Sequence, residues 1–206
     1  MITVWGRKNS SNVKKVLWCL TELGLTYQQK DAGGPFGGLD TPEYLAMNPN
    51  KTIPTYQDGE FILWESNAIL SYLADKYDDG TLLPHNAEFR ARAAQWMYWS
   101  DGSLFPYIKA MMGLLVRTPA EQRDPARVEE LKQALNRLIA MLNDDLAQRD
   151  YIAGDAFSIA DMALAPLLYP WREVCHDRPD FPHIERWFAR IETRPAYRDI
   201  VALPVS

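Results

Sequence analysis

The sequence has few cysteines and no long apolar run. Only Cys19 and Cys175 are present among its 206 residues, which is too few for the disulfide framework of a small secreted protein. No apolar stretch approaches the about 20 residues that a membrane-spanning helix needs. The chain opens on a strand pattern at residues 2–5 rather than on a signal-peptide pattern. We therefore expect a protein of the reducing cytoplasm that does not associate with membranes.

Concentrated positive charge and metal-binding motifs are also missing. The formal net charge is -5, and no run of lysine and arginine interrupts the even spread of charges. Domains that bind nucleic acid usually gather positive charge on one face. No cysteine and histidine spacing typical of a metal site is present. The sequence thus predicts neither a nucleic-acid partner nor a metal cofactor.

What is present in the first 80 residues is an alternation of short strand and helix patterns. Asp58-Gly59 separates the last two strand patterns and is a strong hairpin signal. Helix patterns are recognised by apolar residues three and four apart and by end signals such as Gly24. The predicted order is strand 2–5, helix 13–23, strand 26–30, a short helix from Pro42, strands 55–57 and 61–64, and helix 67–77.

Strand patterns disappear after the segment "DDGTLLPH" (78–85), which has the composition of a linker. A long helix is predicted from Asp124-Pro125 to about Gln148, and Pro182 and Pro195 mark two more. The segment 157–162, "FSIADM", combines the residues of a capping box and a hydrophobic staple. We predict an α/β domain over 1–80, a linker over 81–85 and an all-helical domain over 86–206.

Pro54 stands directly before the strand predicted at 55–57. Proline has no N–H to give to a sheet, so it belongs at the first position of a strand or at an edge. If the Ile53–Pro54 bond is cis, the N–H and C=O groups of Ile53 turn outward and can pair with an extended peptide. The alternative is that Pro54 only makes a rigid turn.

Glu65-Ser66 stands where the hairpin passes into the helix predicted at 67–77. The first N–H groups of a helix are unpaired and attract anions. The Ser66 hydroxyl and the Glu65 carboxylate would add partners for the carboxylate and the ammonium group of a free amino-acid end. The alternative is that Ser66 simply caps the helix. A peptide-binding edge beside such an amino-acid site describes a γ-linked tripeptide.

Three segments carry a resemblance to a known family: "NPNKTIP" (48–54), "DGEFILWESNAILSYLADKY" (58–77) and "SIADMALAP" (158–166). They resemble the cytosolic glutathione S-transferases, and the start "WGR..S.NVKKV" resembles a bacterial subgroup. The resemblance covers essentially the whole chain. It implies a thioredoxin-like domain followed by an all-α domain, usually in a homodimer, with glutathione as co-substrate and no further cofactor.

The resemblance also implies how glutathione is held. Pro54 would be cis, Ile53 would pair with the cysteinyl unit, and Glu65-Ser66 would hold the γ-glutamyl end. Family members often place histidine or arginine ahead of the short second helix to bind the glycyl carboxylate. This sequence has Leu39-Asp40 there, so Lys51, Asn50 or a backbone group would have to serve.

Ser10, Ser11 and Asn12 precede the first predicted helix. A thiol has an ordinary pKa of about 8.5, and a thiolate near a helix start gains from the helix dipole and a hydrogen bond. Serine-using classes of the family have the pattern Ser-x-Asn-aliphatic, which Ser10–Val13 matches. Ser10 is therefore the first candidate for the thiolate donor and Asn12 the second. The alternative is that these residues only cap the helix, and Lys14-Lys15 is interpreted as decorating its solvated face.

The electrophile is expected against the segment "LFPYIKAMMGLLVR" (104–117). Met112 lies in a methionine-rich stretch that suits varied apolar ligands, although such methionines also pack in cores. Lys109 would either lie at the surface or steer a small, carboxylate-bearing electrophile toward the thiolate. The functional hypothesis is glutathione transfer by addition or halide displacement.

Two alternatives remain. A glutathione-dependent isomerase of the zeta type is similar at Ser10-Ser11, but Asn12 replaces its cysteine. A non-enzymatic binding protein would keep the same fold.

Overall fold

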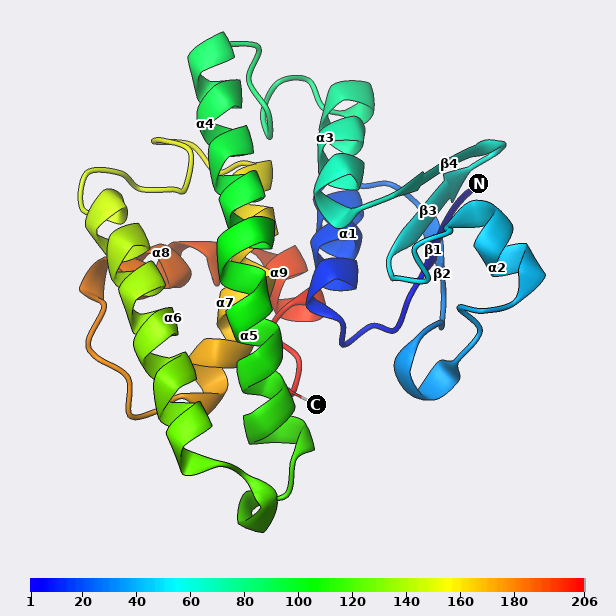
Figure 1. Cartoon of the computed structure of the whole chain (residues 1–206). Helices are drawn as coiled ribbons and strands as arrows, with labels where there is room; N and C mark the ends of the chain where they lie inside the picture. Colours follow the sequence, from blue (N-terminus) through cyan, green and yellow to red (C-terminus); the bar gives the residue numbers. More distant parts are fainter. Residues whose placement is uncertain (206) are drawn as a thin grey trace.

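Four short strands form one mixed sheet in the order β2-β1-β3-β4 (Figure 1). β1 pairs in parallel with β2 and antiparallel with β3. Gly59 closes the hairpin between β3 and β4 with a φ of 63°, a conformation that suits glycine in a two-residue turn. In this computed structural model, which describes residues 1–205, the strands are β1 (Ile2–Trp5), β2 (Tyr27–Lys30), β3 (Thr55–Asp58) and β4 (Phe61–Trp64).

Three helices flank this sheet. In Figure 1, α1 and α3 lie between the sheet and the C-terminal helices, and α2 lies beyond the sheet. Thr41 caps α2 through its side chain, and Pro42 is the first helical residue, as the sequence predicts. A short 3₁₀ turn, η1 (Gly34–Phe36), occurs in the predicted loop. The helices are α1 (Ser11–Glu22), α2 (Pro42–Met47) and α3 (Ser66–Tyr77).

The rest of the described chain is helical, which confirms the predicted fold class. The long helix begins at Pro125 and two others begin at Pro182 and Pro195, as predicted. A π-helical turn, η2, joins α4 to α5, and a second π-helical turn, η3, follows α5. The elements are α4 (Ala87–Trp99), η2 (Ser100–Leu104), α5 (Phe105–Met112), η3 (Gly113–Arg117), η4 (Ala120–Gln122), α6 (Pro125–Leu146), α7 (Ile159–Val174), α8 (Pro182–Ile191) and α9 (Pro195–Ile200).

One continuous apolar core extends through the α/β part and the helical part. α1 packs against both α3 and α7, so Trp18 meets Phe157 and Tyr197 at ring-centroid distances of 5.5 and 5.3 Å. Cys19 is fully buried in this core, and burial raises the pKa of its thiol. The core therefore fixes the start of α1 relative to the helical part. The division into two domains at the linker stays a prediction.

The capping box predicted at Ser158 is present at the start of α7. The Asp161 carboxylate accepts hydrogen bonds from the Ser158 N–H at 2.8 Å, the Ile152 N–H at 2.9 Å and the Trp187 indole N–H at 2.8 Å. Burial raises the pKa of Asp161 to about 6. One carboxylate thus joins α7, α8 and the loop before α7.

Across residues 1–205, none of the helices combines the length and the apolar composition required to span a bilayer.

Candidate functional site

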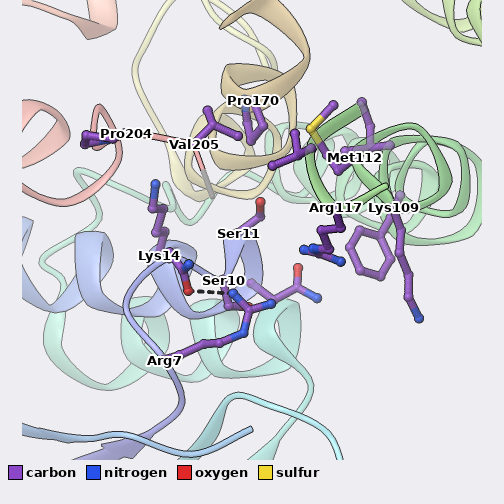
Figure 2. Close-up of a pocket in the computed structure, with 15 residues that line it drawn as sticks. Arg7, Ser10, Ser11, Lys14, Lys109, Met112, Arg117, Pro170, Pro204 and Val205 are labelled. Atoms are coloured by element: carbon purple, nitrogen blue, oxygen red, sulfur yellow. Dashed lines mark hydrogen bonds between the residues drawn. The ribbon is translucent and has the colours of Figure 1, made fainter. Parts of the chain in front are cut away.

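A cleft lies between the start of α1, the segment α5–η3 and the C-terminal segment (Figure 2). It brings Ser10 and Asn12 together with Lys109 and Met112, which the sequence places about a hundred residues away. Its volume is about 140 Å³. The lining residues are Arg7, Asn9, Ser10, Ser11, Asn12, Lys14, Phe105, Ile108, Lys109, Met112, Val116, Arg117, Pro170, Pro204 and Val205.

Ser10 occupies the N-cap position of α1 but does not use its hydroxyl as a cap. Its backbone N–H donates to the Arg7 carbonyl at 3.1 Å, and its own carbonyl accepts from the Lys14 N–H at 2.9 Å. Ser11 and Asn12 are the first two residues of the helix. The capping interpretation is therefore wrong for the Ser10 side chain, and Ser10 lines the cleft at the positive end of α1.

Asn12 carries a buried amide oxygen, Oδ1, that has no hydrogen-bond partner within residues 1–205. Buried polar atoms are nearly always paired, so an unpaired one beside a cleft is available to a bound molecule. An amide turned by half a revolution would present the Nδ2 donor at the same place. Asn12 can thus offer either a donor or an acceptor.

Lys14 and Lys15 are buried, so their interpretation as residues of a solvated face is wrong. The Lys14 ammonium donates to the Val201 carbonyl at 2.9 Å and lies 5.5 Å from the centroid of the Tyr169 ring. Burial lowers the pKa of Lys14 to about 8. Burial also lowers the pKa of Lys15, whose ammonium pairs with Asp101 at 3.1 Å. The reason is that α1 is covered on both sides, which helical periodicity does not reveal.

The second cluster of predicted residues surrounds Ile53 and Pro54. The Ile53–Pro54 peptide bond is cis. The N–H and C=O groups of Ile53 lie outside the strand pairings, which begin at Thr55, and make no loop hydrogen bond within residues 1–205.

Gly6 also contributes to this region, although its role was not predicted from the sequence. A Cβ atom there would lie 2.4 Å from a Val13 methyl carbon and 3.2 Å from the Ile53 Cβ, so glycine permits the close approach of these segments.

Buried polar side chains hold the backbone ahead of Pro54 in place. The Tyr44 hydroxyl donates to the Thr52 carbonyl at 2.6 Å, and the Asn48 amide donates to the same carbonyl at 3.0 Å. The Asn48 amide also lies 3.0 Å from the Thr55 hydroxyl. Because Tyr44, Asn48 and Thr55 are all buried, the Ile53 backbone is presented by a rigid support.

Glu65 and Ser66 stand at the start of α3. Ser66 is the first helical residue and is buried, whereas the N-cap position belongs to Glu65, which makes no side-chain cap. The interpretation of Ser66 as a cap is therefore wrong. Glu65 has a φ of 70° and Lys51 a φ of 55°, and within residues 1–205 no other non-glycine residue has a positive φ. Such strained backbone is frequent at binding sites.

The structure does not place all predicted residues in one hollow. Lys51, Ile53, Pro54 and Ser66 line none of the five hollows described along residues 1–205, including the α1–α5 cleft. Glu65 lines a separate hollow with Tyr98 and Asp101 from α4 and η2. The α1–α5 cleft and the Ile53–Pro54 region are adjacent at Gly6, because a Cβ atom at Gly6 would meet both Val13 of α1 and Ile53.

The α1–α5 cleft is strongly positive. Four cationic side chains line it, and among residues 1–205 no acidic side chain does. Of these four, only Lys109 was expected from the sequence, because no local pattern links Arg7 and Lys14 near the start of α1 to Arg117 at the end of η3. Burial lowers the pKa of Arg7, and the charge of Arg117 lowers it further.

Residues 1–205 contain no group of three or more histidine, cysteine, aspartate or glutamate side chains that could hold a metal ion.

Comparison with known proteins gives consistent matches along the chain. Residues 1–75 match "Glutathione S-transferase, N-terminal domain" and residues 105–195 match "Glutathione S-transferase, C-terminal domain". The chain is 42% identical to Glutathione S-transferase GstB of Escherichia coli, with all of both chains covered. It is 33% identical to Disulfide-bond oxidoreductase YfcG of Escherichia coli, over 90% of this chain and 87% of that one.

Among solved structures, a similar one is the theta class glutathione S-transferase of Xanthomonas axonopodis pv. citri with glutathione bound. It has a TM-score of 0.95 and 41% identity, over 100% of this chain and 99% of that one.

Proposed function

This chain belongs to the glutathione S-transferase family, and from that premise we propose that it joins glutathione, through its sulfur, to small electrophiles. The thiolate sulfur forms a bond to an electrophilic carbon. In a displacement, the carbon–halogen bond breaks and halide leaves with its electron pair, whereas in an addition the electrophile takes up a proton. The observation that carries the proposal is that Ser10 lines the cleft at the start of α1 and that its hydroxyl makes no capping hydrogen bond.

Glutathione would lie along the edge formed by Ile53 and the start of α3. The free N–H and C=O groups of Ile53 suit the backbone of the cysteinyl unit. The exposed Glu65 carboxylate suits the ammonium group of the γ-glutamyl end, and Ser66 with the first N–H groups of α3 suits its carboxylate. Lys51 or Asn50, both exposed, would take the glycyl carboxylate. The Xanthomonas relative has glutathione bound, which supports glutathione as the ligand.

The sulfur would then point at the start of α1. Ser10 is proposed as the main hydrogen-bond donor to the thiolate and Asn12 as the second. Holding the thiolate and the electrophile in one cleft supplies most of the catalysis, because the reaction needs little further chemistry from the protein. Metal ions and other cofactors have no step in this proposal.

The electrophile would pack on the apolar side chains of α5. Phe105, Ile108 and Met112 line the cleft opposite Ser10. The exposed Lys109 extends away from Ser11 and Met112 in Figure 2, at the rim of the cleft. It is proposed to attract a carboxylate-bearing electrophile by its charge rather than to hold it in place. An activity screen with halogenated acids, aryl halides and peroxides tests the class of electrophile.

No feature of the described structure favours the two alternatives, the zeta-type isomerase and the non-enzymatic binding protein. Asn12 stands at the site of the isomerase cysteine, and both Cys19 and Cys175 are buried away from the cleft. A thiol-based step at the cleft therefore has no thiol of this chain available. A glutathione-affinity column, combined with the activity screen, separates a transferase from a binding protein without activity.

A homodimer in the cytoplasm is part of the proposal. Tyr98 on α4 is 77% exposed, and Phe61 on β4 is exposed although its ring stacks on Tyr72 at 4.6 Å. Large apolar side chains left at the surface favour a contact with a second copy. The two unpaired cysteines are consistent with a reducing compartment.

The thiolate donor is tested by titrating bound glutathione. We expect Ser10→Ala to raise the pKa of the bound thiol toward its free value, because the thiolate loses its main hydrogen bond. Each pKa unit corresponds to about 1.4 kcal/mol of thiolate stabilisation. Asn12→Ala should have a smaller effect. The measurement is the ultraviolet absorbance of the thiolate as a function of pH.

Ser11→Ala is the matched control, since Ser11 lies in the same turn. A raised pKa in Asn12→Ala together with an unchanged pKa in Ser10→Ala would assign the role to Asn12. Unchanged values in all three variants would leave the helix end and the backbone as the stabilising groups, and the assignment of Ser10 would be wrong.

Ser66 is tested by its effect on glutathione affinity. We expect Ser66→Ala to weaken binding by about 1–3 kcal/mol, because a carboxylate would lose a hydrogen-bond donor. Isothermal calorimetry with glutathione measures the change. Ser71→Ala is the control, since the Ser71 hydroxyl donates to the Asn67 carbonyl within the same helix. Equal affinities of Ser66→Ala and the unchanged protein would place the γ-glutamyl site elsewhere.

A further inference from the structure

Two arginines from distant parts of the chain face the same cleft. Arg7 lies in the loop between β1 and α1, and Arg117 is the last residue of η3. Figure 2 shows the guanidinium groups of Arg7 and Arg117 on two sides of the space beside Ser10. Burial lowers the pKa of Arg7, and the charge of Arg117 lowers it further. Their meeting is a product of the fold and has no counterpart in any local motif.

Within residues 1–205, neither guanidinium pairs with an acidic side chain. The ion pairs of residues 1–205 include neither Arg7 nor Arg117. The Arg7 side chain donates one hydrogen bond, at 2.5 Å, to the amide oxygen of Asn9, which is a neutral group. Like charges that share a cleft repel each other. An anion between them would remove this cost and gain charge-assisted hydrogen bonds.

We propose that Arg7 and Arg117 form a clamp for the carboxylate of the electrophile. A guanidinium presents its N–H groups in a planar fork that matches the two oxygens of a carboxylate. The apolar side chains of α5 that line the same cleft, Phe105, Ile108 and Met112, would hold a hydrophobic body. The substrate class is therefore an electrophile with a compact apolar body and a terminal carboxylate.

This inference rests on the proposed function, because the clamp would position the electrophilic carbon for the thiolate near Ser10. The role of the clamp differs from the role proposed for Lys109. The Lys109 ammonium lies at the rim and acts by long-range attraction. Arg7 is partly buried and fixed by Asn9, so it can set the distance and the orientation of a bound carboxylate. Arg7 and Arg117 are thus specificity-determining residues.

The test compares two probes of nearly equal size, 4-(chloromethyl)benzoate and its neutral amide, 4-(chloromethyl)benzamide. Rates of conjugation with glutathione are measured for the unchanged protein and for Arg7→Gln and Arg117→Gln. For each variant we expect kcat/KM with the benzoate to fall about 10- to 100-fold, mainly through KM. This is the range for one lost charged hydrogen bond. The ratio of benzoate to benzamide activity should fall to a similar extent.

Arg137→Gln is the matched control. Arg137 is exposed on α6 and does not line the cleft, so this variant loses one positive charge without touching the site. Its ratio of benzoate to benzamide activity should stay within about twofold of the unchanged protein, as expected for a distant, screened charge.

The outcomes separate the clamp from the function on which it rests. If the unchanged protein conjugates neither probe nor any electrophile of the screen, the proposed transferase activity is wrong. If it conjugates the benzamide, and the arginine variants lower kcat/KM equally with both probes, the transferase activity stands and the clamp is overturned. A raised KM for glutathione in these variants, with the probe ratio unchanged, would assign the arginines to a carboxylate of glutathione and would also overturn the proposal.

Discussion

Asp161→Ala is expected to lower the free energy of unfolding by about 3 kcal/mol or more. The carboxylate accepts hydrogen bonds from three buried donors, the N–H groups of Ile152 and Ser158 and the indole N–H of Trp187. Alanine leaves all three without an acceptor, and each such group costs about 1–3 kcal/mol. Urea unfolding followed by tryptophan fluorescence measures the loss.

Asp124→Ala is the matched control for this prediction. Asp124 caps α6 from an exposed position, with one hydrogen bond to the Ala126 N–H at 3.0 Å. Loss of an exposed cap costs about 1 kcal/mol, so the two aspartates should differ clearly. The folded fraction of Asp161→Ala should keep its activity, because Asp161 does not line the cleft. Full stability combined with lost activity would reverse the assignment and give Asp161 a catalytic role.

Asp161 also illustrates which features the sequence predicts well. The capping box, the Asp58-Gly59 turn and the proline at the start of α6 are signals confined to a few neighbouring residues. Their geometry depends on local backbone preferences, which act in the same way in any fold. The sequence indicated Asp161 as a local cap. It could not indicate the bond to Trp187, because that residue belongs to another helix.

The candidate site was predicted only where a motif lies within one segment. The resemblance identified Ser10-Ser11-Asn12 and Glu65-Ser66 together with the proline that proved to be cis. The left-handed backbone of Glu65 was not predictable, since propensity alone would favour glycine at such a position. That Arg7 and Arg117 line one cleft was not predictable either, because only the fold brings the β1–α1 loop close to η3.

Lys14 and Lys15 show the limit of reasoning from periodicity. A charged residue within a helix usually marks a solvent-facing side. α1 instead packs against α3 and α7, and every residue from Val13 to Leu20 is buried. The cost of burying an ammonium group is offset by specific partners, and for Lys15 these partners are Asn67 and Asp101.

Asp101→Ala is expected to destabilise the protein by about 3–5 kcal/mol, because it leaves a buried charge without its counter-ion. The Lys15 side chain is fully buried, and its ammonium lies 3.1 Å from the Asp101 carboxylate and 3.3 Å from the Asn67 amide oxygen. The Asn67 amide in turn donates to Asp101 at 2.8 Å. One carboxylate thus supports contacts among α1, α3 and η2. Urea unfolding at pH 7 measures the change.

Lys15→Met separates the loss of the pair from the burial of an unpaired charge. It removes the ammonium and leaves Asp101, whose side chain is 36% exposed and remains hydrated. Replacing a buried ion by an apolar group of similar size is often close to neutral. We therefore expect Lys15→Met to cost about 1 kcal/mol or less, and the double variant to be more stable than Asp101→Ala alone. A double variant less stable than Asp101→Ala would contradict this account.

The pH dependence of Asp101→Ala gives an independent check. Burial already lowers the pKa of Lys15 in the folded protein, and loss of the carboxylate lowers this pKa further. In the unfolded chain a lysine has its ordinary pKa of about 10.4. Between these two values the unfolded state binds more protons than the folded state, so the free energy of unfolding rises with pH. From pH 7 to about 10, Asp101→Ala should recover stability relative to the unchanged protein, whereas the double variant, which lacks Lys15, should not. Parallel pH curves for Asp101→Ala and the double variant would show that Lys15 is not the charge that Asp101 balances.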